Sequence, residues 1–285
     1  MDELPKGTIE LIGLALSEDL GPGDVTSAAT VPDDADASAR ILLKEPGVVF
    51  GLEVVREVFR QVGVDRVEPE VTEGVWIEEV PGEVAVITGP ARAVLAGERV
   101  ALNFLGHLSG IATLTARFVR ELEGTGTRVL DTRKTTPGMR LLEKAAVAAG
   151  GGENHRTGLF DAVLAKENHI ALAGGIAATV AACRAEAPDL PIEVEAETVQ
   201  QVGEAIEAGV DRILLDNMDL EGLGESVALR DRTGGPAPTL EASGGITLEN
   251  ARAIAGTGVD FISVGALTHS APNLDFSLLV EVDRG

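Results

Sequence analysis

The chain contains very little cysteine and no long apolar run. Of its 285 residues only Cys183 is a cysteine, so no intrachain disulfide can form. No apolar run approaches the ~20 residues that a membrane-spanning helix needs. The first ten residues, MDELPKGTIE, lack the basic and apolar regions of a signal peptide. These absences predict a cytoplasmic protein without a membrane span.

Lysine is also scarce, although the chain is strongly charged. Asp and Glu total 46 residues against 23 Lys and Arg, which gives a formal net charge of −23. The lysines are Lys6, Lys44, Lys134, Lys144 and Lys166. Such a composition suits a halophile with a salty cytoplasm, because the Debye length falls to ~3 Å at 1 M salt and self-repulsion is screened. Without a basic stripe or tail, binding to nucleic acid or to an anionic membrane is not expected.

The second half of the chain repeats one pattern, a short apolar strand followed by an alanine-rich helix. The expected strands are Arg128–Leu130, Ala162–Ala165, Ile192–Val194, Arg212–Leu215, Thr239–Ala242 and Phe261–Val264. The expected helices are Met139–Ala149, Ile176–Ala187, Val199–Ala208 and Leu248–Ala255. This alternation predicts an α/β fold with a parallel sheet. No GxGxxG follows the first strand, so a barrel is favoured over a doubly wound sheet.

The first hundred residues predict a separate, smaller domain. Alternating stretches such as SARILLKEPGVVFG and GEVAVITGPARAVLAGE read as strands, and GLEVVREVFRQVG reads as a helix between them. We therefore expect an N-terminal α/β domain over residues 1–110 and a barrel over residues 111–274. A helical region over 97–123, with a break near Gly106 and Gly110, would join them. A terminal helix over 275–285 would pack back on the first domain.

Polar residues collect where the expected strands end, which is where barrel enzymes place their chemistry. The segment from Arg133 to Lys166 holds six basic and three acidic residues in an otherwise acidic chain. Arg133, Lys134 and Lys166 are expected to bind an anionic substrate, since a charge at a buried strand end is costly without a partner. His155 and Arg156 are weaker candidates for the same site, because their segment, GGGENHR, also fits a surface loop.

Carboxylates and glycine loops complete the candidate site. Glu195 and Asp216 could bind sugar hydroxyls, hold Mg²⁺, or pair with the basic residues. The stretches ASGGIT (242–247) and SVGALTHS (263–270) suit a phosphate cradle at a helix N-terminus. The four histidines have no metal-ligand spacing, so a zinc site is not expected. His169 is expected to orient the segment KENH, and His269 could touch phosphate.

With these motifs in place, the chain resembles the quinolinate phosphoribosyltransferase family. The motifs, in the order of the family, are EDLGPGDVTS, GERVALNFLGHLSGIAT, DTRKTTPGMR, GGGENHRTGLFDAVLAKENHI, IEVEAET, ILLDNM, EASGGIT and SVGALTHS. The departures are small: Glu167 stands where the family often has Asp, and EAET replaces a more usual EVDT. The first could alter a water or metal contact near Lys166, without an expected loss of activity.

The resemblance implies a fold, a reaction and a set of roles. The fold would be an α/β sandwich domain followed by an incomplete, seven-stranded α/β barrel. The reaction would move phosphoribose from phosphoribosyl pyrophosphate to quinolinate, with loss of CO₂, giving nicotinate mononucleotide and pyrophosphate in de novo NAD synthesis. The implied cofactor is Mg²⁺, and the implied assembly is at least a homodimer.

The resemblance also assigns residues, by their positions in these motifs. Quinolinate carboxylates would be held by Arg133, His155 and Arg156. Lys134 and Lys166 would lie between the two substrates, while Glu195 and Asp216 would bind the ribose hydroxyls and the Mg²⁺ region. The 5′-phosphate would be cradled by Ser243, Gly244, Gly245 and Gly265, with His269 nearby. Arg99 would reach into the site of the neighbouring subunit.

Three other interpretations stay open at this point. The chain could be a barrel aldolase that uses Lys166 or Lys134 as a Schiff base. It could be a divergent relative of the same family, tied to molybdate transport loci, with another acceptor. It could also be a non-catalytic barrel that binds phosphorylated ligands, although so many charged strand-end residues argue against this.

Overall fold

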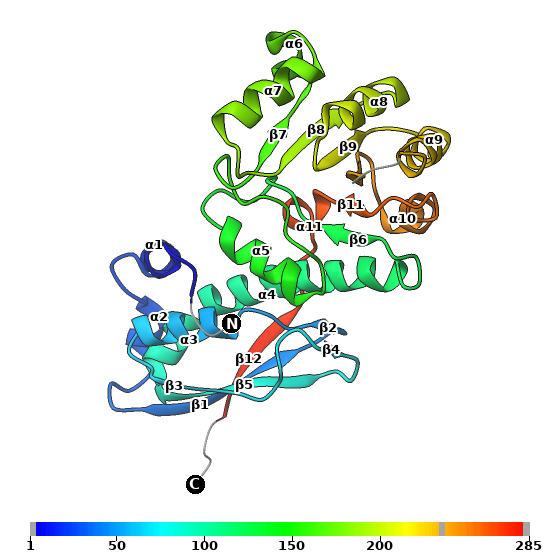
Figure 1. The fold of residues 1–285 in the computed structure, drawn as a ribbon. Helices are drawn as coiled ribbons and strands as arrows, with labels where there is room; N and C mark the ends of the chain where they lie inside the picture. The colour runs from blue at the N-terminus through cyan, green and yellow to red at the C-terminus, as the bar shows by residue number, and fades with distance from the viewer. Residues whose placement is uncertain (1–3, 234–236, 282–285) are drawn as a thin grey trace. The chain divides into compact units, whose positions relative to one another are not determined.

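The computed structural model describes residues 4–233 and 237–281. The chain divides into two compact units, which are drawn in Figure 1. The first unit comprises Met1–Ala116, Thr135–Gly151 and Thr268–Gly285, and the second comprises Arg117–Lys134 and Gly152–Leu267. Both units are discontinuous along the chain, and the expected division at residues 110 and 274 stays a prediction.

The first unit is built on an antiparallel sheet with the strand order β12-β1-β5-β3, beside a two-stranded ribbon of β2 and β4. Its strands are β1 (Asp36–Leu43), β2 (Gly47–Val48), β3 (Arg66–Pro69), β4 (Trp76–Ile77), β5 (Gly82–Pro90) and β12 (Phe276–Glu281). Its helices are α1 (Thr8–Leu20), α2 (Val25–Thr30), α3 (Leu52–Gln61), α5 (Arg140–Ala149) and most of α4 (Ala91–Glu121). In β1 the buried residues alternate with more exposed ones, the period-2 pattern of a sheet with one covered face.

The end of the chain is a strand and not the expected helix. Strand β12 pairs antiparallel with β1 over Ser38–Leu43, within the first unit. Phe276 and Leu278 are buried and Ser277 between them is less so, which is an alternation with the period of a strand. The helix prediction was wrong because six residues are too few to distinguish the two periods. Residues 282–285 of this prediction lie outside the described residues.

Helix α4 runs for 31 residues without the expected break. Gly106 and Gly110 do not interrupt it; they let another part of the same unit approach its backbone. The N–H of Leu274 donates to the carbonyl of Gly106 at 3.0 Å. A side chain at Gly110 would collide with the backbone carbonyl of Pro272. The two glycines therefore serve close packing between backbone segments.

The second unit is a parallel sheet of six strands in the order β6-β11-β10-β9-β8-β7, with helices between successive strands (Figure 1). The strands are β6 (Arg128–Leu130), β7 (Val163–Ala165), β8 (Ile192–Ala196), β9 (Arg212–Asp216), β10 (Thr239–Ser243) and β11 (Phe261–Ser263). The helices are α6 (Glu167–Ala173), α7 (Ile176–Glu186), α8 (Val199–Ala208), α9 (Leu220–Asp231), α10 (Leu248–Ala255) and α11 (Ala266–His269), whose last residues belong to the first unit.

This sheet agrees closely with the strands expected from the sequence, each of which is found within one or two residues. The resemblance implied seven strands, whereas the described residues form six named ones. At the seventh place, beside β6, Glu153 makes only an isolated parallel bridge to Leu130. The α/β class and the parallel arrangement are confirmed.

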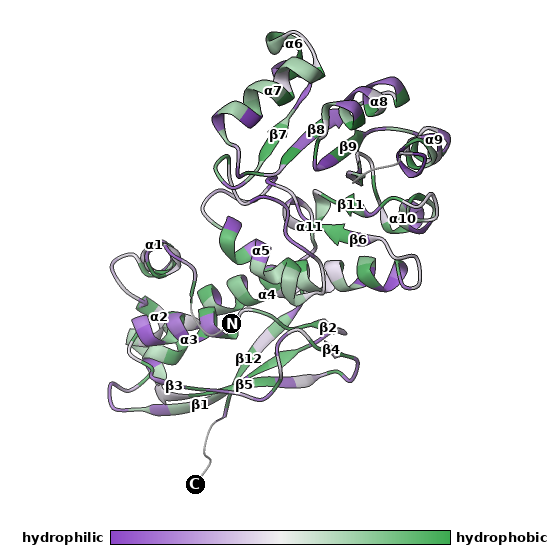
Figure 2. Ribbon diagram, in the orientation of Figure 1, coloured by the Kyte–Doolittle hydropathy of each residue, from purple (hydrophilic) through white to green (hydrophobic). Residues whose placement is uncertain are grey.

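The two faces of the parallel sheet differ in chemistry. One face carries apolar side chains that are buried, among them Val194, Ile213 and Ala242. The opposite face carries charged and polar side chains. On this face Glu193 lies in register with Arg212, and Asp216 lies in register with Ser243. Purple segments accordingly interrupt the green of β8 and β9 in Figure 2. The apolar face is suited to packing against the helices of the unit. The charged face is then left on the inner side of the sheet.

Replacing Gly110 by alanine is expected to lower the free energy of unfolding by roughly 1–3 kcal/mol, because the added methyl group meets a backbone carbonyl that cannot rotate away. The matched control is Gly224→Ala in α9, where the surroundings are open. That change should raise the free energy of unfolding by ~0.5–1 kcal/mol through the better helix propensity of alanine. Denaturant unfolding in molar KCl measures both, and equal effects would contradict the packing argument.

Candidate active site

The carboxyl ends of the strands in the second unit bring together several of the predicted site residues. Lys166 follows β7 and caps the N-terminus of α6, where the backbone N–H of Lys166 donates to His169 Nδ1 at 3.1 Å. This confirms the orienting role expected of His169. The Nζ atom of Lys166 lies 2.8 Å from Glu195 Oε2, near the end of β8. The lysine side chain is half exposed, whereas Glu195 is buried.

Strands β9 and β10 place the next groups. Asp216 ends β9 and accepts a hydrogen bond from the side-chain amide of Asn217 at 2.8 Å. Asn217 adopts a left-handed backbone conformation, and its N–H donates to the carbonyl of Ser243 at 2.9 Å. A side chain at Gly244 would collide with the Asn217 side chain. Glycine at 244 is therefore required by the close approach of these two strand ends.

The stretch from Ser243 to Thr247 forms the turn between β10 and α10. Gly244 and Gly245 both have positive φ angles, of 100° and 59°. The helix begins with a capping box in which the N–H of Thr247 donates to Asn250 Oδ1 at 2.8 Å. A glycine turn that leads into a helix N-terminus is a suitable place for a phosphate. Gly265, the other predicted cradle residue, follows β11.

The arginines form the positive part of the site. Nη1 of Arg156 donates to the carbonyl of Ala162 at 3.2 Å, whereas its Nε is buried and makes no hydrogen bond within the described residues. Burial lowers the pKa of Arg156, and so does the charge of Arg133 close by. Two like charges held together at a half-buried position favour an anion between them. Lys134 is exposed, and its backbone N–H donates to Thr132 Oγ1 at 3.1 Å.

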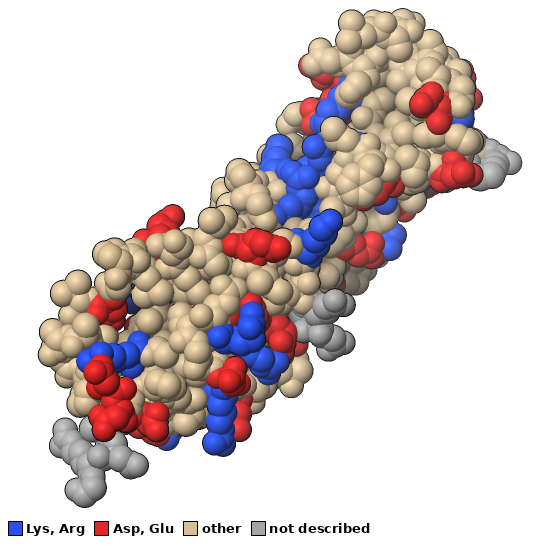
Figure 3. Space-filling model, turned by 90° about the vertical axis from the view of Figure 1, so that its left-hand side faces the viewer, with Lys and Arg blue, Asp and Glu red and all other residues tan. Residues whose placement is uncertain are grey.

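Lys and Arg side chains gather in one group on the face of the molecule drawn in Figure 3. Elsewhere on this face, blue side chains lie next to red ones, as expected for surface ion pairs.

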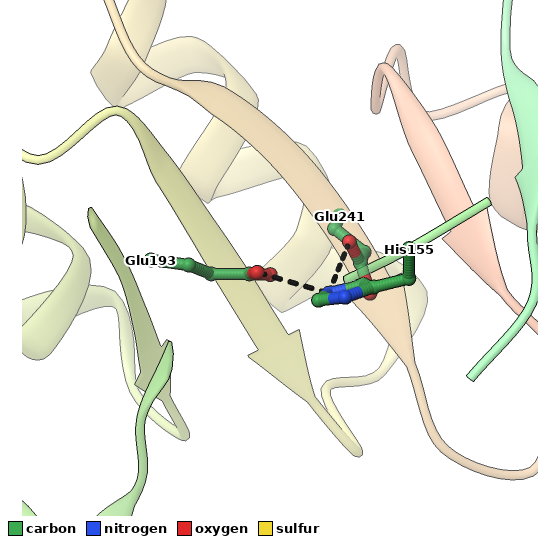
Figure 4. A group of neighbouring side chains, drawn as sticks. All are labelled: His155, Glu193 and Glu241. Carbon is green, nitrogen blue, oxygen red and sulfur yellow. Dashed lines mark ion pairs between the residues drawn. The ribbon is translucent and has the colours of Figure 1, made fainter. Parts of the chain in front are cut away.

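His155 contacts two buried carboxylates through one ring nitrogen. Its Nε2 lies 2.9 Å from Glu193 Oε2 and 3.6 Å from Glu241 Oε2 (Figure 4). Its Nδ1 accepts the backbone N–H of Arg156 at 2.7 Å. Both ring nitrogens thus face protein groups. The role expected of His155 at the quinolinate carboxylates stays a prediction.

The carboxylates around His155 have unequal environments. Burial raises the pKa of Glu241 to about 7, and the nearby charge of Glu193 acts in the same direction. Burial lowers the pKa of His155, but the bond and the charge of Glu193 outweigh this, so the pKa is raised on balance. Nη1 of Arg212, at the start of β9, lies 3.1 Å from Glu241 Oε2 and supplies a positive charge to the cluster.

Arg212 and Arg128 were not singled out from the sequence. Their guanidinium groups lie over the ring of Phe261, at 4.3 Å and 4.2 Å from its centroid. The sequence did contain a signal for Arg212. It stands four residues before Asp216 in the same strand, and side chains at even spacing in a strand share one face.

Arg99 and His269 belong to the first unit and are not part of this set. Arg99 lies on α4 and is mostly exposed, with Glu98 Oε1 at 3.7 Å from its Nη2. His269 ends α11, and its Nδ1 lies 2.6 Å from the hydroxyl of Ser270. In the same unit, His107 Nε2 lies 2.8 Å from the fully buried carboxylate of Glu143.

Comparison with known proteins identifies this arrangement. The family model described as the C-terminal domain of quinolinate phosphoribosyl transferase matches residues 111–279, and the model of the N-terminal domain matches residues 24–109. The chain belongs to the quinolinate phosphoribosyltransferase family. The prediction of this family from the sequence motifs is therefore confirmed.

Individual relatives cover nearly the whole length. The nicotinate-nucleotide pyrophosphorylase [carboxylating] of Mycobacterium leprae is 43% identical over 274 residues, which span 94% of this chain and 95% of the relative. The probable enzyme of the same name from Bacillus subtilis is 44% identical over 272 residues, 94% of this chain and 91% of the relative. The crystal structure of NadC from Streptococcus pyogenes has a TM-score of 0.91 at 39% identity, covering 99% of this chain and 100% of that one.

Family membership establishes the activity as well. The chain is an enzyme, a carboxylating nicotinate-nucleotide pyrophosphorylase, with quinolinate phosphoribosyltransferase activity in de novo NAD biosynthesis. No helix in the described ranges has the length and apolar character that crossing a membrane would require.

The raised pKa of Glu241 predicts how stability changes with pH. A carboxyl whose folded pKa exceeds its unfolded value binds more protons in the folded state, so its contribution to stability falls as pH rises from about 4.5 towards 7. The free energy of unfolding of the wild type, minus that of Glu241→Gln, should therefore decrease between pH 5 and pH 8. Urea titrations at several pH values in molar KCl measure this difference.

Glu249→Gln is the control for that experiment. Glu249 is exposed, and its hydrogen bond with Thr247 lowers its pKa. Its contribution is therefore lost only as pH falls through that lowered value, and it should be constant between pH 5 and pH 8. A Glu241 difference as flat as the Glu249 difference would contradict the assignment.

Proposed function

We propose that quinolinate and phosphoribosyl pyrophosphate react at the carboxyl ends of the strands in the second unit. The observation that carries the proposal is the buried Nε of Arg156, which makes no hydrogen bond among the described residues and lies close to the charge of Arg133. A buried donor without a partner costs free energy unless a ligand supplies an acceptor. Quinolinate supplies two carboxylates for this purpose.

The quinolinate end of the site is assigned to Arg133 and Arg156. Guanidinium groups bind planar carboxylates through two parallel hydrogen bonds, so two arginines suit a dicarboxylic acid. Lys134 and Lys166 are assigned to the region between the two substrates. His155, which the resemblance placed among these ligands, is assigned a supporting role, because its ring nitrogens face Glu193 and the Arg156 backbone.

The phosphoribosyl end is assigned to the neighbouring strands. Glu195 and Asp216 would accept hydrogen bonds from the ribose hydroxyls. The backbone N–H groups of Ser243, Gly244 and Gly245 would bind the 5′-phosphate, because the positive φ angles of these glycines turn the chain at the start of α10. Gly265 completes the proposed phosphate ligands of the second unit, and a contact of His269 with the phosphate stays a prediction.

The proposed cofactor is Mg²⁺, held by the same carboxylates. Glu195 and Asp216 provide oxygen donors of the kind that Mg²⁺ prefers, and the ion usually keeps several water or phosphate ligands. Glu195 Oε2 faces Lys166 and Asp216 Oδ2 faces Asn217, so each carboxylate has a second oxygen to offer. When bound, Mg²⁺ would neutralise charge on the leaving pyrophosphate.

The chemistry requires positioning more than a nucleophile from the protein. Displacement of pyrophosphate by the ring nitrogen builds negative charge on the leaving group, which Lys134 and Lys166 can stabilise. Once the ring nitrogen is quaternary, loss of the 2-carboxylate leaves a carbanion next to a positive charge. Arg133 and Arg156 would hold the two carboxylates in place while this bond breaks.

An aldolase mechanism fits the geometry less well. A Schiff base needs a free amine that can attack a carbonyl carbon, whereas the Lys166 amine is engaged by the carboxylate of Glu195 at 2.8 Å. The family match also argues against an aldolase and against a non-catalytic binding protein.

Arg156→Ala is expected to lower kcat/KM for quinolinate by at least ~100-fold, since it removes a charged ligand from the proposed site. The assay combines purified protein, quinolinate, phosphoribosyl pyrophosphate and Mg²⁺ in molar KCl, and follows nicotinate mononucleotide and CO₂. The salt is chosen because the acid-rich, lysine-poor composition suits a halophilic cytoplasm.

The matched control for this assay is Arg184→Ala, which removes a surface ion pair with Asp211 and should leave the rate within about twofold. No product from a wild-type protein that is shown to be folded would overturn the quinolinate assignment. Trapping of a substrate adduct on Lys166 by borohydride would favour the aldolase instead.

A dimer in which Arg99 completes the neighbouring site makes a separate prediction. Arg99→Ala and Lys166→Ala should each be nearly inactive, because each removes a cation from the proposed site. Mixed dimers of the two variants would contain one intact site, so re-association should restore about a quarter of the wild-type rate. The rate is measured after mixing the variants and allowing the subunits to exchange. No recovery among dimers that have exchanged subunits would place Arg99 in the site of its own chain.

A further inference from the structure

The cluster under the arginines contains two carboxylates that have no role in the proposed binding of substrate. Glu193 lies on β8 and Glu241 on β10, and both carboxylates are buried and face the same ring nitrogen, Nε2 of His155 (Figure 4). The ring in turn accepts the backbone N–H of Arg156. The four groups form one connected chain of contacts from the strands to the arginine.

We propose that Glu193 and Glu241 are positioning residues for quinolinate binding: they clamp the His155 ring, whose Nδ1 fixes the backbone from which the Arg156 side chain extends. The inference rests on the proposed role of Arg156 as a quinolinate ligand. It adds two residues to the binding machinery, neither of which touches the substrate.

The geometry supports this because a backbone N–H cannot turn away from its acceptor without moving the chain. On the other side of the same segment, the N–H of His155 donates to the buried carboxylate of Asp131 at 2.8 Å. Beyond Arg156, the N–H groups of Thr157 and Gly158 donate to Asp161. The orientation of the His155 ring thus fixes the point in this segment where Arg156 begins.

The cluster could alternatively be a metal site, since His155, Glu193 and Glu241 offer ligand atoms within 4.8 Å of one another. Two contacts argue against a metal. A metal on Nε2 would leave Nδ1 to carry the ring proton, and that proton would collide with the Arg156 N–H. Arg212 already supplies a positive charge to Glu241. We therefore assign a proton, and not a metal ion, to the position between His155 Nε2 and the two carboxylates.

The charges around the ring make the clamp sensitive to pH. The groups that face His155 are Glu193 from β8, Arg212 and Glu241 from β9 and β10, Asp131 after β6, and Arg133 and Arg156. The carboxylates favour a charged ring, whereas the Arg156 N–H requires an unprotonated Nδ1. Protonation of Nδ1 at low pH would expel this N–H and displace Arg156. Affinity for quinolinate should therefore fall on the acid side.

The test compares Glu193→Ala and Glu193→Gln by steady-state kinetics with each substrate varied in turn. Glu193→Ala should raise KM for quinolinate at least ~10-fold, because a misplaced ligand loses affinity. KM for phosphoribosyl pyrophosphate should stay within about twofold. Glutamine retains an acceptor for the ring N–H, so Glu193→Gln should restore most of the affinity at pH 8.

The pH profile separates positioning from a merely structural role. Glu193→Gln removes a negative charge beside His155, which lowers the pKa of the ring. The acid limb of 1/KM for quinolinate should therefore move to lower pH in this variant. It should move less in Glu241→Gln, because burial raises the pKa of Glu241 to about 7 and the carboxyl is already largely protonated on the acid side. An unchanged limb in Glu193→Gln would overturn the proposal, even if Glu193→Ala does not fold.

Two further measurements distinguish the possible failures. Glu143→Gln alters a comparable buried carboxylate–histidine pair in the first unit and should leave KM for quinolinate unchanged. If Arg156→Ala raises this KM and Glu193→Ala does not, the positioning role is wrong while the role of Arg156 stands. If Arg156→Ala leaves it unchanged, the assignment of Arg156 fails and the inference with it. One equivalent of metal in the purified protein, lost in Glu193→Ala, would establish the metal site instead.

Discussion

The second unit depends on keeping charge balanced on the inner face of its parallel sheet. Most parallel sheets bury apolar side chains on both faces, because an unpaired charge inside a protein is costly. Here Glu193 and Glu241 are buried on that face, and His155 and Arg212 supply the compensating groups. The carboxylates share one cluster, so removing any member leaves another without compensation.

This balance is arranged in layers along the strands. At the amino ends, Arg128 and Arg212 stack on Phe261, and Arg212 also reaches Glu241. Above them lies the clamp around His155. At the carboxyl ends the pairing is less complete: the Lys166 side chain remains half exposed although it contacts Glu195. The charges nearer the amino ends of the strands compensate one another inside the unit, whereas Lys166 at the carboxyl end remains accessible.

The sequence alone predicts the strands of the second unit because each is a short apolar run between helices with capping signals. It fails where tertiary packing decides. Gly106 and Gly110 suggested a break in α4, yet they accommodate the backbone of residues 272–274. The β12 segment has no period long enough to reveal a strand. The contacts of Glu193 and Glu241 with the ring of His155 are also tertiary, and no pattern in one sequence shows them.

The contact between Lys166 and Glu195 shows how an acidic enzyme can bind a polyanion. Before substrate arrives, Glu195 supplies the negative charge that keeps the lysine from being a lone cation at a strand end. On the proposed assignment, the pyrophosphate group of the substrate would replace Glu195 as the partner of Lys166, and Glu195 would be one of the residues that hold Mg²⁺. Because one charged partner would replace another, the net gain from ground-state binding would be modest. Lys166 would then act most strongly as negative charge grows on the leaving pyrophosphate, which is where stabilisation would accelerate the reaction.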